Sequence, residues 1–390
     1  MINKYKRQMI TALIICIILT CSGCWDRREL KSLAIISGFA IDRVPGTNQV
    51  QVTVQILNIS KVSSGSQGGG EGQGGGAVLI SAQGPTVYEA LLECTHKTSR
   101  QLFFPHAQVL LISEDLAREG ISNDIDFFLR NHEIRDTIWV MVTKGKAADI
   151  LNTKPMLEQI SSQDLSKMVI TRAVTSMASG LNLYEVVKRI TSKSSAPLTS
   201  YIEKIKDNQQ ERLSLTGTAV FNRNLQMVGT LSGRETRGLL WAINQAHRGV
   251  LVVKTPGSNG YTSIEVLRAK GAIKPEISNG KLLIKIKIHC ISTVQDTQGY
   301  LDMESRAVWE SLQSRGETVI SNDIMMAVKK SRQLNVDIFG FGDAVYKKYP
   351  DQWKQMQSNW QDVFNDLNVQ VSVDLVIRRS GLLRNSVRAQ

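Results

Sequence analysis

The sequence of 390 residues predicts an α+β fold, with two to three mixed α/β modules and largely antiparallel sheets. Segments in which apolar and polar residues alternate, as they do in half-buried strands, occur in both halves of the chain. Segments with helical periodicity lie between them, the longest at 304–348. A polar stretch at 191–212 separates the two groups of elements, and we place a boundary between modules there.

The composition is that of a folded, basic protein. The chain has 47 Lys and Arg against 35 Asp and Glu, a formal net charge of +12, and 42% hydrophobic residues. These values are close to the averages of globular proteins, so they exclude a disordered chain and a polytopic membrane protein. We do not expect nucleic-acid binding, because the few aromatic residues do not alternate with the basic ones and the amino terminus predicts export.

Residues 1–23 are predicted to be a cleaved lipoprotein signal peptide. Lys4, Lys6 and Arg7 precede an uncharged apolar run at 9–19, which is too short for a bilayer span of about 20 residues. The following Ser22-Gly23-Cys24 resembles a bacterial lipobox, in which small residues precede a cysteine. The thiol of Cys24 would accept a diacylglyceryl group, and cleavage would follow Gly23.

One departure from the lipobox is Cys21, which stands where that pattern usually has Leu. Cys21 could itself carry the lipid, but Leu19 and Thr20 would then occupy the small-residue positions, so we favour Cys24. Two acyl chains, such as palmitate, hold a protein stably at a membrane.

Three residues beside the lipid are expected to lie at the level of the headgroups. Trp25, Arg27 and Arg28 follow Cys24 directly, and an indole and two guanidinium groups suit that layer. A plain tether without a specific contact is the alternative interpretation of this segment.

The module at 24–195 is predicted to mix strands and helices, as one unit or as two subdomains. A flexible Gly-rich loop is expected at 63–76. It contains the pattern G-x-G-x-x-G but leads into a strand, whereas a dinucleotide-binding loop leads into a helix. The predicted strands are 33–41, 50–56, 77–80, 107–112 and 137–142, and the predicted helices are 85–94, 121–129, 156–177 and 183–190.

The module at 213–390 is predicted to contain strands and long helices. Asn279-Gly280 is a strong signal for a two-residue hairpin, and the strand after it has one apolar and one largely basic face. Pro350 begins a helix, and the apolar stripe at 353–367 is interpreted as a core face. The predicted strands are 218–221, 250–253, 263–269, 282–288 and 369–377, and the other predicted helices are 234–244 and 304–348, the latter bent around 340–342.

No pattern of catalytic or metal-binding residues is found, so we predict no enzyme, no metal site and no cofactor. The stretch at 229–233 places Ser232 one position too late for a nucleophile elbow. Cys94 and Cys290 are favoured as two buried free thiols, and their pairing is left open. None of the five histidines belongs to a metal-binding spacing: His96, His106, His132, His247 and His289.

Several blocks, taken together, resemble the Ger(x)C lipoproteins of endospore-forming bacteria, the C subunit of the spore germinant receptor. They span nearly the whole mature chain in the order of that family. The blocks are GCWDRREL at 23–30, GFAID at 38–42, GTAVF at 217–221 with Leu231, ETRGLL at 235–240, and DIFGFG at 337–342 with Pro350, Trp353 and Trp360.

The resemblance implies three α+β domains held by lipid on the outer face of the spore inner membrane. It also implies assembly with the membrane-embedded A and B subunits into a complex that senses nutrients, with recognition of the germinant assigned mainly to the B subunit. Only Cys24 carries over as a chemically defined site. An extracytoplasmic solute-binding lipoprotein, with two α/β lobes around a cleft, is the alternative function, and direct binding of a germinant is left open.

Overall fold

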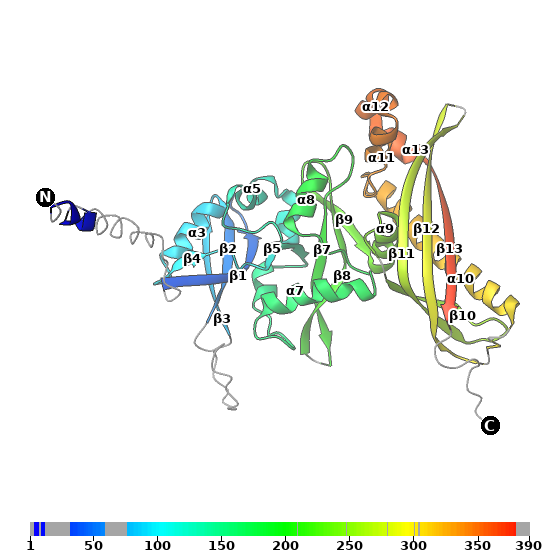
Figure 1. The fold of residues 1–390 in the computed structure, drawn as a ribbon, viewed down its shortest axis with the longest axis horizontal. Coiled ribbons are helices and arrows are strands. Elements are labelled where there is room, and N and C mark those ends of the chain that lie inside the picture. The colour runs from blue at the N-terminus through cyan, green and yellow to red at the C-terminus, as the bar shows by residue number, and fades with distance from the viewer. Residues whose placement is uncertain are drawn as a thin grey trace.

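The computed structural model describes residues 4–7, 9–11, 32–58, 76–208, 210–246, 248–278, 280–299, 301–302 and 305–379. These residues form two β-sheets with helices packed on them, which confirms the predicted multi-domain α+β fold (Figure 1). Cys24, Trp25, Arg27, Arg28 and residues 63–75 of the Gly-rich loop lie outside the described residues. No helix in the part of the chain that the structure describes is long and apolar enough to cross a membrane.

The first sheet has parallel strands in its middle and antiparallel strands at its edges. The order is β3-β2-β1-β5-β6-β7-β8-β9, with β4 beside β1. The pairs β1–β5, β5–β6 and β6–β7 are parallel. Its strands are β1 (Leu33–Arg43), β2 (Val50–Leu57), β3 (Ala77–Gly84), β4 (Gln101–Phe103), β5 (Val109–Ser113), β6 (Trp139–Thr143), β7 (Leu198–Asp207), β8 (Gln210–Phe221) and β9 (Met227–Ser232).

Helices cover both faces of this sheet, so its central strands are buried on both sides. In β5, Leu110 and Ile112 belong to one apolar cluster, whereas Val109 and Leu111 belong to a second cluster on the other face. The helices of this region are α3 (Val87–Thr95), α4 (Glu114–Glu119), α5 (Ser122–Arg130), α6 (Ala147–Leu151), α7 (Ser161–Thr171), the 3₁₀ turn η2 (Arg172–Val174) and α8 (Leu183–Ile190).

The helix predicted at 156–177 ends too late, because η2 ends at Val174, and it is wrong at its start, because α7 begins only at Ser161. The side-chain amide of Gln55 on β2 fixes the start of α7. Its Nε2 donates to Ser161 Oγ at 2.8 Å, and its Oε1 accepts from the Ser162 backbone N–H at 3.1 Å. A buried amide from a distant strand therefore sets the first turn, and helical periodicity in the local sequence could not show it.

The polar stretch at 191–212 includes β7 and the start of β8, and these strands pair with β6 and with each other. The first sheet therefore continues past residue 213 to Ser232. Leu198 and Ile202 of β7 point into the core, while polar residues between them share the strand. The division of the chain into modules stays a prediction.

The second sheet has the order β10-β11-β12-β13, and its last pair is parallel. Ser278 pairs with Lys281, and Gly280 has φ +73°, so the two-residue hairpin is confirmed. The elements are β10 (Gly249–Lys254), β11 (Tyr261–Ser278), β12 (Lys281–Thr297), β13 (Asn368–Arg379), α9 (Gly233–Ala242), α10 (Arg306–Gln333), α11 (Phe341–Lys348), α12 (Pro350–Met356), the 3₁₀ turn η3 (Gln357–Asn359) and α13 (Trp360–Asp366).

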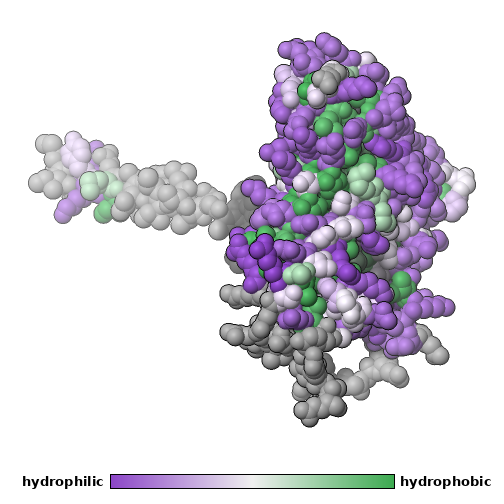
Figure 2. Space-filling model, turned by 90° about the vertical axis from the view of Figure 1, so that its right-hand side faces the viewer, coloured by the Kyte–Doolittle hydropathy of each residue, from purple (hydrophilic) through white to green (hydrophobic). Residues whose placement is uncertain are grey.

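The two faces of β12 differ as the alternation predicts. Ile284, Ile286 and Ile288 are buried on the side of the sheet that packs on the helices, whereas Lys287 and His289 are exposed on the other side. Figure 2 views the molecule from the end where this sheet lies, and hydrophilic side chains cover most of that surface around a hydrophobic band.

The long helical region is interrupted between Gln333, where α10 ends, and Phe341, where α11 begins. Gly340 has φ +73° at this point, a backbone conformation that favours glycine. The apolar stripe at 353–367 is divided among α12, η3 and α13, so it is not one helix. Its interpretation as a core face is confirmed, because Trp353, Trp360 and Phe364 belong to the main apolar cluster.

Candidate functional site

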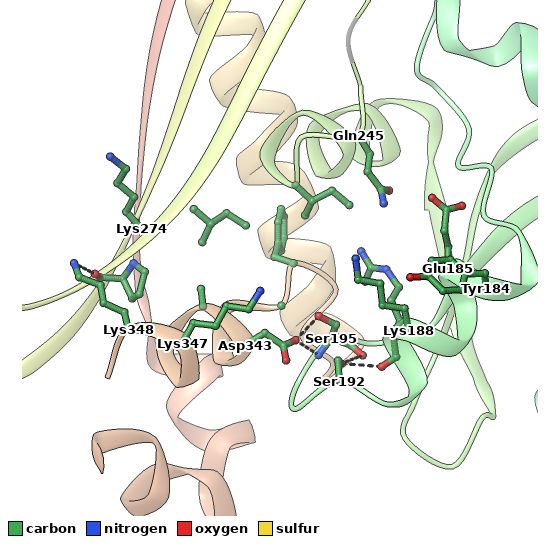
Figure 3. A pocket seen from close by; sticks show the side chains of 17 residues that line it. Tyr184, Glu185, Lys188, Ser192, Ser195, Gln245, Lys274, Asp343, Lys347 and Lys348 are labelled. Atoms are coloured by element: carbon green, nitrogen blue, oxygen red, sulfur yellow. Dashed lines mark hydrogen bonds between the residues drawn. The ribbon is translucent and has the colours of Figure 1, made fainter. Parts of the chain in front are cut away.

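A pocket of about 870 Å³ lies where the first sheet's helices meet the second sheet (Figure 3). One wall comes from α8 and the loop after it. The opposite wall comes from α11 and from residues 273–275 of β11, and the loop after α9 closes one side. The lining residues are Tyr184, Glu185, Lys188, Arg189, Ser192, Ser195, Ile243, Gln245, Ile273, Lys274, Pro275, Phe339, Gly340, Asp343, Ala344, Lys347 and Lys348.

Helix α8 presents its polar side to the pocket. Asn182 and Glu185 form a capping box, in which each side chain accepts from the other residue's backbone N–H, and this fixes the helix start at Leu183. Leu183 and Val186 are buried, so the helical period turns Lys188 outward. A basic residue in the last turn also interacts favourably with the helix dipole.

Two carboxylates hold the loop after α8 against the start of α11, and we call residues 193–196 with Asp337 and Asp343 the serine clamp. Asp343 accepts from Lys193 N at 2.8 Å, Ser195 N at 3.0 Å and Ser195 Oγ at 2.5 Å. Asp337 accepts from Ser194 Oγ at 2.8 Å, and the Ala196 N–H donates to its backbone oxygen, also at 2.8 Å. The clamp therefore fixes one wall of the pocket.

The two carboxylates of the clamp have opposite pKa shifts. Burial acts to raise the pKa of Asp343, but hydrogen bonds from Ser195, Lys193 and Ser194 outweigh it and hold the pKa below its ordinary value. Burial dominates at Asp337 and raises its pKa, although Gly342 and Ser194 are among its donors. Asp343 is thus the fixed negative charge of the clamp.

Five cationic side chains and two carboxylates line the pocket. Arg189 has a structural role, because its Nη1 donates to the backbone oxygens of Ala196 at 2.9 Å and Ile338 at 3.0 Å. Burial lowers the pKa of Arg189 to about 10, which leaves the guanidinium charged at neutral pH. Lys348 Nζ donates to the Pro275 backbone oxygen at 2.9 Å.

Lys188 and Lys347 differ from these two cations. Like Lys348 they are exposed, but within the described ranges neither of their ammonium groups has a hydrogen bond or lies within 4.0 Å of a carboxylate oxygen. In Figure 3, both side chains extend into the space between α8 and α11. Ile243, Ile273 and Phe339 supply an apolar surface beside them.

Cys24, Trp25, Arg27 and Arg28 are outside the described residues, so the lipid attachment stays a prediction. Cys94 and Cys290 are both buried free thiols, as favoured. Burial raises the pKa of Cys94 to about 11 and that of Cys290 to about 12.

The pocket could not be recognised in the sequence, because its residues come from four separate segments. The signals that were available are the basic pairs at 188–189 and 347–348, one in each of two helices. Each pair alone is an ordinary helix end. Among the described residues, no group of three or more His, Cys, Asp or Glu side chains is placed to hold a metal ion.

Three of the blocks that carry the family resemblance contain residues whose contacts hold elements of the fold together. Asp42 accepts from Ala147 N at 2.6 Å and Ala148 N at 3.0 Å, at the first turn of α6. Arg237 in the ETRGLL block pairs with the buried Asp323 of α10. Asp337 in the DIFGFG block belongs to the serine clamp.

Comparisons with known proteins match the chain over almost its full length. Residues 26–204 match the family described as "Spore germination protein N-terminal domain", and residues 216–381 match "Spore germination B3/ GerAC like, C-terminal". The chain is 28% identical to spore germination protein KC of Bacillus subtilis (strain 168), covering 99% of this chain and 98% of that protein. It is 23% identical to spore germination protein B3 of the same organism, and the match covers 97% of this chain and 98% of that protein.

One solved structure, described as the crystal structure of the GerBC protein, has a similar fold. The TM-score is 0.56 at 20% identity, and the match covers 90% of this chain and 99% of that chain. At this identity, the likeness concerns the fold alone.

Proposed function

This chain belongs to the spore germination GerAC family, and we propose that it is a lipid-anchored, non-enzymatic C subunit of a nutrient germinant receptor, required for the spore germination response. The observation that carries the proposal is the match along the whole chain to proteins named for spore germination. The lipobox-like Ser22-Gly23-Cys24 supports the anchored form of this role.

In this role, the lipid at Cys24 holds the folded part on the outer face of the spore inner membrane. Trp25, Arg27 and Arg28 lie at the headgroup level. The folded part contacts two membrane-embedded partners, the A and B subunits, and couples them mechanically to the anchored chain. Relatives named spore germination proteins A3 and B3 support a place in a receptor complex.

The alternative, an extracytoplasmic solute-binding lipoprotein, calls for two α/β lobes around a cleft. The second sheet fits that architecture poorly, because β10, β11 and β12 form an antiparallel meander that packs on the long helix α10. This observation, together with the germination relatives, favours the receptor subunit.

The test compares spores that carry Cys24→Ala with spores that carry Cys21→Ala. We expect Cys24→Ala to move the chain from the membrane to the soluble fraction and to lower the response to nutrients. We expect Cys21→Ala to retain both the membrane location and the nutrient response. A Cys24→Ala chain that remains on the membrane in spores that germinate normally contradicts the proposal.

The partners are tested separately by crosslinking in spore membranes, followed by purification of this chain. We expect two polytopic membrane proteins to be captured by wild type and both to be lost or reduced with Cys24→Ala. Capture of neither from wild type argues against the receptor complex, whatever the lipid result is.

A further inference from the structure

We propose that the pocket between α8 and α11 binds a small organic carboxylate, a molecule with an apolar or aromatic body and at least one carboxylate group. The proposal concerns a ligand site that is separate from the lipid anchor at Cys24. It stands on the charge of the pocket, on the hydrogen bonds that its carboxylates accept, and on the apolar residues in its lining.

The charge of the lining favours an anion. Lys188 and Lys347 approach the same space from different helices, and neither has an ionic partner among the described residues. Lys274 and Lys348 add further positive charge at the same walls. Walls of one sign with low-dielectric surface between them concentrate the field, so they attract an ion of the opposite sign.

The two carboxylates in the lining do not neutralise these lysines. Asp343 is turned toward the serine clamp, where it accepts from Lys193 N, Ser195 N and Ser195 Oγ. Glu185 is turned back to the start of its own helix, where its Oε2 accepts from Asn182 N at 3.1 Å. Both oxygens of Asp343 and one oxygen of Glu185 thus accept hydrogen bonds within the protein.

The apolar part of the lining favours an organic body over a small inorganic ion. Ile243, Ile273 and Phe339 line the same pocket as the lysines, and the volume of about 870 Å³ is within the range of small-molecule pockets. An inorganic phosphate would leave most of that surface in water. A body that covers it would gain from burial, while its carboxylate pairs with an ammonium group.

The walls come from both sheets, so an occupied pocket would join them. Lys188 belongs to α8, which packs on the first sheet, whereas Lys347 belongs to α11, which contacts β11 of the second sheet. The serine clamp already fixes the distance between these helices, so the site is preorganised. Ligand binding should therefore stabilise the contact between the two sheets.

The experiment is calorimetric titration of the full chain in detergent micelles with three probes. Phthalate tests the proposed ligand class, benzamide is a neutral aromatic control, and inorganic phosphate tests charge alone. The test variant is Lys188→Gln/Lys347→Gln. The control Lys154→Gln/Lys206→Gln removes two exposed lysines that do not line the pocket and so changes the net charge equally. All four lysines are exposed, and equal thermal unfolding midpoints establish that the variants fold.

We expect saturable binding of phthalate at millimolar concentration by wild type and the control, at least tenfold weaker binding by the test variant, and none of benzamide. Absence of saturable phthalate binding overturns the proposal, as does equal weakening in both variants. Phosphate binding as tight as that of phthalate overturns the proposal that the ligand has an organic body, because charge alone would then account for binding.

Discussion

The contact between α9 and α10 includes a buried charge. The variant Asp323→Ala tests how much this charge contributes to the free energy of unfolding. The Asp323 carboxylate is fully buried, and Arg237, whose side chain is 5% exposed, donates to its Oδ2 from Nε at 2.8 Å and from Nη2 at 2.5 Å. Arg234 reaches Oδ1 at 2.8 Å, but its side chain is 52% exposed. Removal of Asp323 therefore leaves one buried guanidinium without its counter-charge.

The expected cost follows from the burial of each arginine. An uncompensated buried charge lowers the free energy of unfolding by about 3–5 kcal/mol. The pair with the exposed Arg234 adds at most about 1 kcal/mol, because solvent screens it. Arg237 Nη1 keeps its bond to the Val250 backbone oxygen at 2.7 Å, so one donor stays satisfied and the lower half of the range is expected.

The assay is urea denaturation of the chain from Trp25 onward, followed by the fluorescence of its tryptophans. The matched control is Asp126→Ala, which removes the exposed ion pair with Arg130 and should leave the free energy of unfolding almost unchanged, because solvent screens that pair. The double variant Asp323→Ala/Arg237→Leu removes both buried charges and should recover most of the loss. A loss below about 1 kcal/mol for Asp323→Ala, or a double variant no more stable than the single one, would refute the reasoning.

Three further predictions concern other positions. Gly238→Ala should lower the free energy of unfolding by about 1–3 kcal/mol in the same assay, because a Cβ there would lie 2.2 Å from the Asp323 backbone oxygen; an unchanged midpoint contradicts this. The stabilising effect of ionised Asp343 is fully present above its ordinary pKa of 3.8 and is lost as the pH falls through its lower folded-state pKa. The difference in stability between wild type and Asp343→Asn should thus be constant from neutral pH down to about pH 5 and should shrink only in stronger acid; a difference that already changes near neutral pH contradicts it. In the chain from Trp25 onward, Cys94 and Cys290 should not react with a disulfide reagent at pH 8 until the protein is unfolded, since burial keeps both thiols protonated; rapid reaction of the native chain contradicts this.

The spacing of apolar residues predicted those strands and helices in which one face is buried along the whole element. The alternation at 50–56 predicted β2, and the period of 183–190 predicted α8 with the bounds that the structure has. These predictions succeed because each residue's face is fixed by its spacing. The same reasoning failed at the start of α7, where the distant Gln55 decides the first turn.

Strand neighbours could not be predicted in the same way. The alternation at 369–377 predicted β13, but not that it lies parallel to β12, because a strand's side-chain period says nothing about its partner. Similarly, the polar stretch at 191–212 concealed β7, whose apolar residues are few and are divided between the two apolar clusters, with Leu198 in one and Ile202 in the other.

The sequence by itself determined the α+β class, the lipobox-like amino terminus and the family blocks, because each depends on residues that are close together in the chain. Only the tertiary structure decided which charges are compensated. Asp343 meets Ser195 across a separation of 148 residues, whereas Lys188 and Lys347 meet no carboxylate within the described ranges. Coulomb interactions and hydrogen bonds act through space over a few ångströms, so the order of residues along the chain does not specify them.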